Sequence, residues 1–253
     1  MTSLPHVLLS ASNLSLSANG AVLLNNLNVQ INAGEVVGVI GPNGAGKSSL
    51  LKLLAGVSSP TTGVIRLEDK ALADCTALQK AKSVGYLEQR PHVYWPLSVA
   101  QIVSLGRLPH ADASAVQNDA AVEVALKFTG IASMRERLFN TLSEGEKMLV
   151  NISRVLATEP RMILADEPTA ALDPYHQLLV LELLRALATQ GRGIMVVLHD
   201  LTLAARFCDR LVLLAAGSVV CDGKPEAVLT SSHIAQAYHI DATYDEVTGT
   251  VTT

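Results

Sequence analysis

The most informative stretch of this chain is the octapeptide Gly41-Pro42-Asn43-Gly44-Ala45-Gly46-Lys47-Ser48. It fits the pattern G-x-x-x-x-G-K-[ST], which forms a loop that binds phosphate groups. Glycines let successive backbone N–H groups point inward at a phosphate, because no Cβ stands in the way. The alternative is a glycine-rich turn that binds nothing, and the residues on either side decide between the two.

The flanking residues favour a phosphate-binding loop. The apolar run 36–40 predicts a buried parallel strand, and residues 48–54 predict the opening of a helix. A helix start adds unpaired N–H groups and the positive end of the helix dipole. We therefore expect a nucleoside triphosphatase in which Lys47 reaches the β- and γ-phosphates and the Ser48 hydroxyl binds Mg²⁺. The residues expected at the nucleotide are Gly41, Pro42, Asn43, Gly44, Ala45, Gly46, Lys47, Ser48 and Ser49.

Composition limits the class of protein. A chain of 253 residues with 49% hydrophobic residues suffices for one large α/β domain with an insertion. The net charge of -4 gives no reason to expect a nucleic-acid partner. The three cysteines form no C-x-x-C pair, which is typical of a reducing compartment. No apolar run has the length of a membrane span, and no signal peptide is evident, so we expect a soluble cytoplasmic chain.

The order of patterns predicts the domain organisation. Residues 7–35 read as short β-segments with turns, whereas apolar spacing in 93–157 indicates helices. We expect an α/β fold: a P-loop NTPase core with a mainly parallel sheet, an N-terminal antiparallel β region and an inserted helical subdomain. The core would comprise 1–92 and 158–253, and the helical subdomain 93–157. The polar, Thr-rich end, 244–253, is expected to be loosely held.

Acidic residues follow a second apolar strand. Asp166 and Glu167 come directly after the run 162–165. In an open α/β sheet, side chains at the carboxyl ends of strands face the ligand crevice. One carboxylate there can hold Mg²⁺ beside Ser48, and its neighbour can orient or deprotonate a water. The alternative is an ordinary acidic turn, which the phosphate-binding loop disfavours.

The segment Leu142-Ser143-Glu144-Gly145-Glu146 has two interpretations. Ser143 with Glu146 three residues later is a capping box that starts a helix. A helix N-terminus with serine and glycine is also an anion site.

Together these segments resemble the ATP-binding-cassette (ABC) family. The resemblance covers residues from about 8 to about 230 and rests on six motifs in the family's order. They are the loop 41–48, Gln89, the Leu-Ser-x-Gly-Glu signature at 142–146, Leu164–Thr169, Ala170–Asp173 and His199.

The resemblance implies a homodimer in which two cassettes sandwich two ATP molecules. Each ATP would lie between the phosphate loop of one subunit and the signature of the other, contacted by Ser143 and Gly145. It assigns Glu167 to catalysis, His199 to the γ-phosphate, and Gln89 to Mg²⁺ and the attacking water. Asp166 would be associated with Mg²⁺. Asp173 would communicate across the dimer.

A narrower resemblance lies in the run Val99–His110, which ends Gly-Arg-x-Pro-His. It is similar to the cassettes of bacterial importers for iron chelates, haem and vitamin B12; the alternative is a helix followed by a proline turn. It implies an ATPase at the cytoplasmic face of the inner membrane, bound to integral-membrane permease subunits and served indirectly by a periplasmic or surface solute-binding protein. Rival functions are a DNA-repair ATPase and a translation-associated regulator. The first normally needs a long coiled coil after Gln89, and the second usually carries two cassettes in one chain.

Three residues or segments depart from the family pattern. Glu144 stands where glycine is commonest and adds a negative charge near a phosphate site. No Tyr or Phe lies between residues 1 and 40, so the aromatic that usually stacks on adenine is missing. The run Lys147–Asn151 is less polar than usual.

The segment Arg90–His110 is expected to receive a permease helix between core and insertion, through Tyr94, Trp95, Leu97 and Arg107. For Trp95 itself a packing anchor is the favoured interpretation and a partner surface the alternative. The histidines His6, His92, His176, His233 and His239 have no shared metal-binding spacing, and most are expected at the surface.

Overall fold

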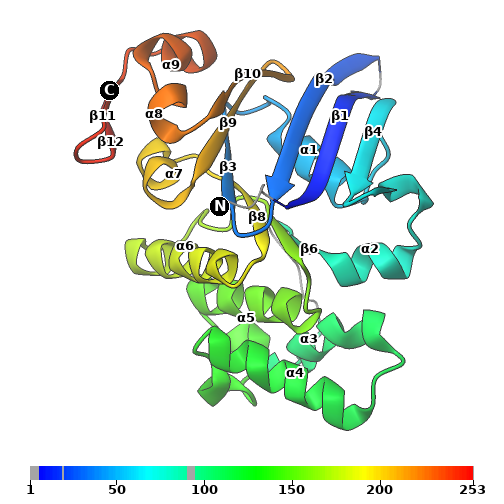
Figure 1. The fold of residues 1–253 in the computed structure, drawn as a ribbon. Helices are drawn as coiled ribbons and strands as arrows, with labels where there is room; N and C mark the ends of the chain where they lie inside the picture. Colours follow the sequence, from blue (N-terminus) through cyan, green and yellow to red (C-terminus); the bar gives the residue numbers. More distant parts are fainter. Residues whose placement is uncertain (1–5, 19, 90–94, 253) are drawn as a thin grey trace, which may run out of the picture.

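The computed structural model describes residues 6–18, 20–89 and 95–252. Its centre is a sheet in the order β10-β9-β3-β8-β7-β6, in which only β10 runs antiparallel to its neighbour (Figure 1). The strands are β3 (Val36–Ile40), β6 (Val84–Leu87), β7 (Met162–Ala165), β8 (Gly193–Val197), β9 (Arg210–Ala215) and β10 (Ser218–Gly223). The predicted α/β class with a mainly parallel sheet is confirmed. The boundary predicted at residues 92 and 93, and Tyr94, lie outside the described residues.

A second sheet, in the order β2-β1-β4-β5, is antiparallel and is formed by the N-terminal region. Its strands are β1 (Val7–Ala18), β2 (Ala21–Asn32), β4 (Thr62–Leu67) and β5 (Lys70–Ala71). β1 and β2 are longer than the short segments that the sequence indicates. Register shifts, including one between Ala11 and Leu14 where Asn13 has a φ of 50°, interrupt the alternation of apolar residues.

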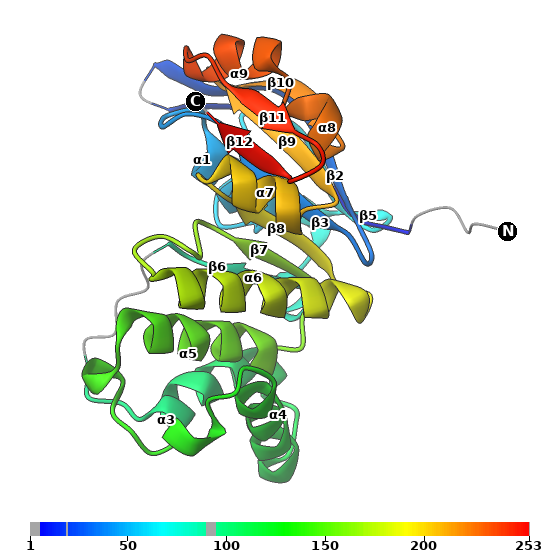
Figure 2. The ribbon, with the colours of Figure 1, turned by 90° about the vertical axis from the view of Figure 1, so that its left-hand side faces the viewer.

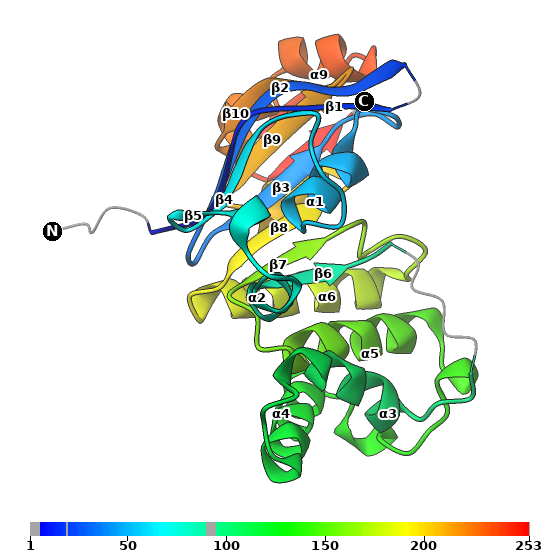
Figure 3. The same ribbon diagram turned by 90° about the vertical axis from the view of Figure 1, so that its right-hand side faces the viewer.

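Helices cover both faces of the central sheet. Around it lie α1 (Lys47–Leu54), α2 (Ala77–Ser83), α6 (Pro174–Thr189), α7 (Leu201–Phe207), α8 (Pro225–Val228) and α9 (Ser231–Tyr238). Farther from the antiparallel sheet, beyond α6, lie α3 (Val99–Ser104), α4 (Ala115–Phe128) and α5 (Glu144–Ala157), as Figures 2 and 3 show. Short 3₁₀ turns occur at Leu72–Asp74, Leu105–His110, Ala132–Met134 and Phe139–Thr141.

The central sheet is buried on both faces, and β3 shows why. Val37 and Val39 pack with α1 and the antiparallel sheet, whereas Val36 and Ile40 belong to the core shared with α5 and α6. All residues of β3 are buried, as the continuous apolar run predicts for a parallel strand. The carboxyl end of this strand is therefore held in a fixed position, and it fixes the start of the phosphate loop that follows it.

The C-terminal stretch forms a hairpin that packs against the core, contrary to the expectation of a loosely held end. Residues 243–252 form a hairpin of β11 (Thr243–Asp245) and β12 (Thr250–Thr252). The backbone N–H of Val251 donates to Oγ1 of Thr202 on α7 at 3.0 Å. Tyr244 and Val251 pack against the core. Thr243 and Thr252 pair across the two strands of this hairpin. Composition alone does not distinguish a Thr-rich hairpin from a polar tail.

The Gly-Arg-x-Pro-His run links α4 to the C-terminal end of α5 through Arg107. Arg107 is only 7% exposed; its Nε donates to Oδ1 of Asn118 at 2.9 Å, and its Nη1 donates to the Ala157 carbonyl at 2.6 Å. Nη1 also pairs with Glu159 at 2.6 Å. The expectation that Arg107 faces a partner is therefore wrong, because its donors are used inside the subunit.

Trp95 also differs from its favoured interpretation. Its side chain is 74% exposed, so it is not a packing anchor. Leu97, two residues later, is partly buried against the core. The surface alternative for Trp95 remains.

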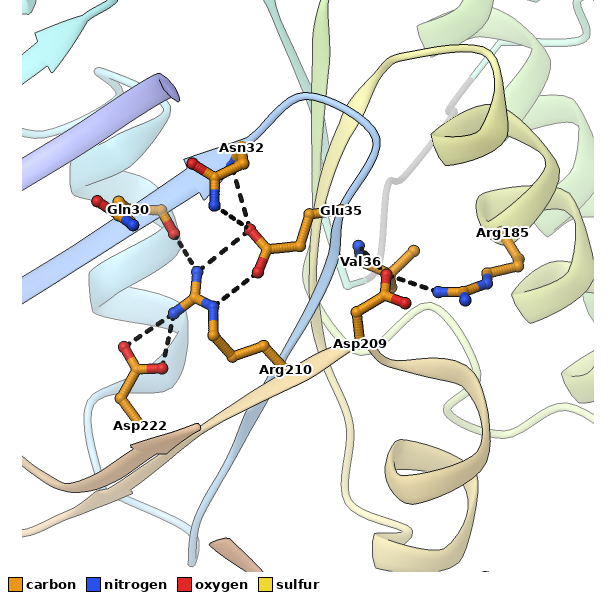
Figure 4. Close-up of polar contacts among 8 residues, drawn as sticks. All are labelled: Gln30, Asn32, Glu35, Val36, Arg185, Asp209, Arg210 and Asp222. Atoms are coloured by element: carbon orange, nitrogen blue, oxygen red, sulfur yellow. Dashed lines mark hydrogen bonds and ion pairs between the residues drawn. The ribbon is translucent and has the colours of Figure 1, made fainter. Parts of the chain in front are cut away.

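Arg210 joins the two sheets (Figure 4). It is the first residue of β9 and therefore lies at the end of the sheet opposite the phosphate loop, which follows the parallel strand β3. From β9, its Nε donates to Oε1 of Glu35 at 2.7 Å and its Nη2 to the Gln30 carbonyl of β2 at 2.6 Å. Its Nη1 donates to both oxygens of Asp222 on β10, at 2.6 and 2.8 Å. Glu35 in turn accepts from Nδ2 of Asn32 at 2.9 Å. One guanidinium thus fixes the turn that leads from the antiparallel sheet into β3.

Candidate active site

The phosphate loop connects β3 to α1 through strained backbone that requires glycine. Gly41 has a φ of 146° and Gly46 a φ of 96°. A Cβ on Gly41 would collide with the Leu214 carbonyl, and one on Gly46 with the carbonyl of Leu23. These two positions admit no other residue without rearrangement, which explains their place in the pattern.

Lys47 is held inside this loop. Its Nζ donates to the carbonyls of Gly41 at 2.7 Å and Pro42 at 2.9 Å, and the residue is only 5% exposed. Burial lowers the pKa of Lys47, while Glu167 and Asp166 act in the opposite direction. The ammonium group is therefore buried among backbone carbonyls, and the negative charges of Glu167 and Asp166 stabilise it.

Asp166 lies directly beside the start of α1. Its backbone N–H donates to the Leu87 carbonyl at 2.9 Å, which continues the β6–β7 pairing, and its Oδ1 accepts from Oγ of Ser48 at 3.0 Å. The residue is 3% exposed, and burial raises the pKa of its carboxyl. Burial therefore outweighs the hydrogen bond from Ser48, and this incompletely compensated carboxylate is a reason for a cation to bind there.

The oxygens of Ser48 and Asp166 are a donor set suited to Mg²⁺. Within the described residues, no group of three or more His, Cys, Asp or Glu side chains could hold a metal without other ligands. Mg²⁺ usually takes one or two protein oxygens and completes its shell with phosphate and water. The residues present therefore fit a metal that arrives with a nucleotide.

Glu167 lies between two polar side chains from neighbouring strands. Its Oε1 is 2.6 Å from Nε2 of His199, and its Oε2 accepts from Nε2 of Gln89. Gln89 follows β6, Glu167 follows β7 and His199 follows β8, and these three strands are adjacent. Glu167 has a φ of 50°, a conformation that a non-glycine residue adopts at a cost. The structure thus brings together the three residues predicted to be catalytic.

Tyr86 is a further residue at this site that sequence reasoning did not identify. It lies on β6, and burial, followed by the charge of Asp166, raises the pKa of its phenol. A tyrosine in an apolar strand reads as core, so its position beside Asp166 becomes evident only from the pairing of β6 with β7.

The signature segment caps helix α5. The backbone N–H of Glu146 donates to Oγ of Ser143 at 3.2 Å, and that of Ser143 donates to Oε2 of Glu146 at 2.8 Å. The capping-box interpretation is confirmed, with Ser143 left exposed at the helix start. Glu144 pairs with Lys147 at 2.7 Å. An anion-binding role for this end stays a prediction.

Asp173 is the N-cap of α6, with its side chain bonded to His176. Among the hydrogen bonds of the described residues, none joins Ser143, Gly145 or Asp173 to the phosphate loop. These three form a second group, apart from Ser48, Gln89, Asp166, Glu167 and His199.

Within residues 6–18, 20–89 and 95–252, no helix combines the length and apolar character needed to cross a membrane.

Comparison with known proteins identifies the family. Residues 24–170, more than half of the chain, match the family described as ABC transporter. The hemin import ATP-binding protein HmuV of Bordetella avium is 38% identical over 92% of this chain and 93% of its own length. The solved structure of cbiO1 from Clostridium perfringens, part of the ABC transporter complex cbiONQ, superposes with a TM-score of 0.81 at 29% identity, over 91% of this chain and 94% of that one.

A dimeric bacterial ABC transporter cassette, MJ0796, superposes with a TM-score of 0.76 at 28% identity, over 86% of this chain and 98% of that one. Three findings indicate the same family. They are the match to the family model, the similarity to HmuV over nearly the whole chain, and the grouping of Gln89, Glu167 and His199. This chain belongs to the ABC transporter family, as one of its ATP-hydrolysing cassettes.

Proposed function

We propose that this chain is the ATP-hydrolysing subunit of a bacterial importer that takes up haem or a related metal chelate through a separate permease. The observation that carries the ATPase part is Glu167, held between Gln89 and His199 beside the Ser48–Asp166 pair. The similarity to a hemin import protein supports the substrate class. Iron-siderophores and vitamin B12 are the other members of that class.

The nucleotide would bind first through its phosphates. Backbone N–H groups of the loop and the start of α1 would surround the β- and γ-phosphates. Lys47, whose Nζ now donates to two loop carbonyls, has both the charge and the position to donate to phosphate oxygens instead. Ser48, Asp166 and Gln89 would hold Mg²⁺, which when bound neutralises charge on the phosphate oxygens.

Hydrolysis would then depend on Glu167. A water placed by Gln89 gives a proton to the Glu167 carboxylate and attacks the γ-phosphorus, and the bond from that phosphorus to the bridging oxygen breaks to leave ADP and phosphate. His199 would contact the γ-phosphate from its position beside Glu167. Because Glu167 is already bonded on both oxygens, its direction is set before a substrate arrives.

Two copies of the chain would form the working unit. Ser143 and Asp173 are exposed and belong to a group separate from the phosphate loop, as expected of residues that serve the nucleotide of a second subunit. The dimeric cassette MJ0796 supports this assembly. We assign Ser143 and Gly145 to the γ-phosphate across the dimer and Asp173 to communication between the two sites.

The chain would work at the cytoplasmic face of the inner membrane, on permease subunits fed by a solute-binding protein. We divide it into a core of residues 1–92 and 158–253 and a helical signature subdomain of 93–157, with the permease bound between them. The exposed Trp95 and Leu108 support this location for the contact. The non-transport alternatives, DNA repair and translation control, find no support in the relative or the structures above.

Uptake of labelled haem by cells that lack the chain is the direct test. We expect uptake to fall, to recover with the intact chain and not with Lys47→Ala, and the tagged chain to co-purify with membranes and a permease. Normal haem uptake in cells without the chain, together with its sedimentation with ribosomes or DNA, would contradict the proposal.

A further inference from the structure

His176 contacts both segments that we assign to the nucleotide of the partner subunit: Asp173 at the start of α6 and Gly145 at the start of α5. It is the third residue of α6, and its backbone N–H donates to Oδ1 of Asp173 at 3.0 Å. Its ring Nδ1 lies 2.7 Å from Oδ2 of the same carboxylate. One residue therefore engages both oxygens of Asp173, although that side chain is otherwise open to solvent.

The chemistry of the pair fixes the histidine tautomer. The backbone hydrogen bond from His176, followed by the bond from its ring, lowers the pKa of Asp173, so the carboxyl is ionised at neutral pH. An ionised carboxylate only accepts hydrogen bonds. Nδ1 of His176 must therefore carry a proton and donate it to Asp173.

The imidazole ring also packs on the start of α5. A Cβ placed on Gly145 would overlap the ring of His176, whose side chain is only 21% exposed. The ring of Tyr175 stands against it edge-on, with centroids 5.2 Å apart and planes at 82°. Asp173, Gly145 and Tyr175 thus fix the ring, and His176 is an exception to the expectation that most of the histidines lie at the surface.

This contact is not what holds the two helices together. α5 and α6 lie side by side (Figure 2), and Leu149 and Ile152 of α5 share one buried core with Leu181 and Leu184 of α6. The His176 contact lies at the N-terminal ends of both helices, where Ser143 and Asp173 are the caps. Loss of the imidazole is therefore expected to change the spacing of these ends rather than the fold.

We propose that His176 is a positioning residue that holds Asp173 and the Gly145 end of α5 as one unit, so that a subunit presents both to the ATP bound by its partner in a single geometry. The proposal rests on the proposed dimeric ATPase. The signature needs a small residue at position 145 partly because the His176 ring occupies the space beside it.

Two single variants of His176 separate the effect of its hydrogen bond to Asp173 from the effect of its side-chain volume. His176→Leu keeps most of the volume and loses the donor, whereas His176→Asn keeps a donor near the position of Nδ1. We expect kcat to fall about tenfold in His176→Leu, the size of one hydrogen bond to a charged group, with ATP binding to the isolated subunit unchanged and His176→Asn recovering most of the rate.

His233→Leu is the matched control. His233 is likewise the third residue of a helix, α9, bonded through its backbone N–H to the cap Thr230 at 3.2 Å, and its ring Nδ1 is 3.2 Å from the Val228 carbonyl. A general effect of removing such a histidine would slow both variants equally, which would overturn the proposal.

Mixed dimers show on which nucleotide His176 acts. In the Glu167→Gln background, occluded ATP is counted in two arrangements. Pairing a Lys47→Ala subunit with a His176→Leu subunit should leave one competent site and about one ATP, because the intact phosphate loop faces an intact signature. Placing both substitutions in one subunit, opposite an otherwise unchanged one, should leave clearly less, because the one intact phosphate loop then faces the weakened signature.

Equal occlusion in the two arrangements, or the reverse order, would overturn the role across the dimer. Failure of the unsubstituted chain to hydrolyse ATP and of Glu167→Gln to dimerise with ATP would instead reject the proposed function. The two failures are therefore distinguishable from the same preparation.

Discussion

Nε2 of His199 lies 2.6 Å from Oε1 of Glu167, and this pair sits where two adjacent parallel strands, β8 and β7, end. Gln89, at the end of β6, binds the other oxygen of the same carboxylate. Strand order thus assembles the site: three residues distant in the chain meet because their strands are neighbours. The carboxylate is held in a fixed direction before a nucleotide arrives, which suits a reaction that depends mainly on positioning.

Arg210→Met should destabilise the protein without changing its nucleotide chemistry. The substitution leaves Glu35 and Asp222 without the guanidinium between them, and an uncompensated, partly buried carboxylate costs roughly 3 kcal/mol. Chemical denaturation should show the loss in the free energy of unfolding. ATP affinity of the folded fraction should match that of the wild type.

Arg66→Met serves as the control for Arg210→Met, because Arg66 is exposed and its side chain bonds the Asp69 carbonyl at 3.0 Å. The free energy of unfolding of Arg66→Met should lie within about 0.5 kcal/mol of the wild-type value. Equal losses in the two variants would show that Arg210 does not join the sheets in the way described.

Glu144→Gly should alter ATPase activity only a few-fold. Glu144 pairs with Lys147 along the helix, so its charge is partly neutralised rather than directed at a phosphate. Ser143→Ala should reduce activity more, because it removes both the cap and a hydroxyl proposed to contact the γ-phosphate. Steady-state hydrolysis and ATP-driven dimerisation of the two variants decide the point. An increase in dimerisation by orders of magnitude in Glu144→Gly would mean that Glu144 faces the phosphate.

Base recognition should be weak, because no Tyr or Phe precedes the phosphate loop. Loss of stacking costs on the order of 1 kcal/mol or more, so binding should rest on the phosphates and discriminate ATP from GTP less than about tenfold. Competition binding measures the ratio. Ala18→Tyr, at the exposed end of β1, should tighten ATP binding, whereas Ser12→Tyr on the same strand should not. A strong ATP preference in the unsubstituted chain would reject this account.

The exposed side chains of Trp95 and Leu108 should couple the chain to its permease. Both are highly exposed, at 74% and 73%. Trp95→Glu and Leu108→Glu should abolish transport and leave the ATPase rate of the isolated subunit unchanged, whereas Val247→Glu on the C-terminal hairpin should affect neither. Cysteines at 95 and 108 should cross-link to cytoplasmic loops of the permease. Consistent failure to cross-link in a complex that still transports would move the interface elsewhere.

Much of the active site could be predicted from the sequence because its residues follow apolar strands. The loop at 41–48, Asp166 and Glu167 could each be assigned from local pattern, and the parallel sheet brings their positions together. The sequence does not show which partner a side chain chooses. The Glu167–His199 pair and the place of Tyr86 both depend on strand order.

The errors have a common physical origin. Residue type and sequence neighbours favour a partner contact for Arg107 and a packing anchor for Trp95. In the fold, however, Arg107 uses its donors inside the subunit and the Trp95 side chain is 74% exposed. The bulge near Asn13 interrupts the alternation of apolar and polar residues in β1, so the sequence pattern indicates only short segments there. The sequence around His176 shows no metal-binding pattern and indicates no other role, because its contacts are with a helix cap and a glycine that only the folded chain brings close.

The central claim is that Glu167 is the carboxylate that activates water for ATP hydrolysis. Single-turnover and steady-state hydrolysis by Glu167→Gln test it most directly, with nucleotide binding and dimerisation measured on the same sample. We predict turnover lowered by more than about a hundredfold, ATP binding retained and a stable ATP-bound dimer, because the amide keeps the shape and loses the base. Undiminished hydrolysis by Glu167→Gln would contradict the account.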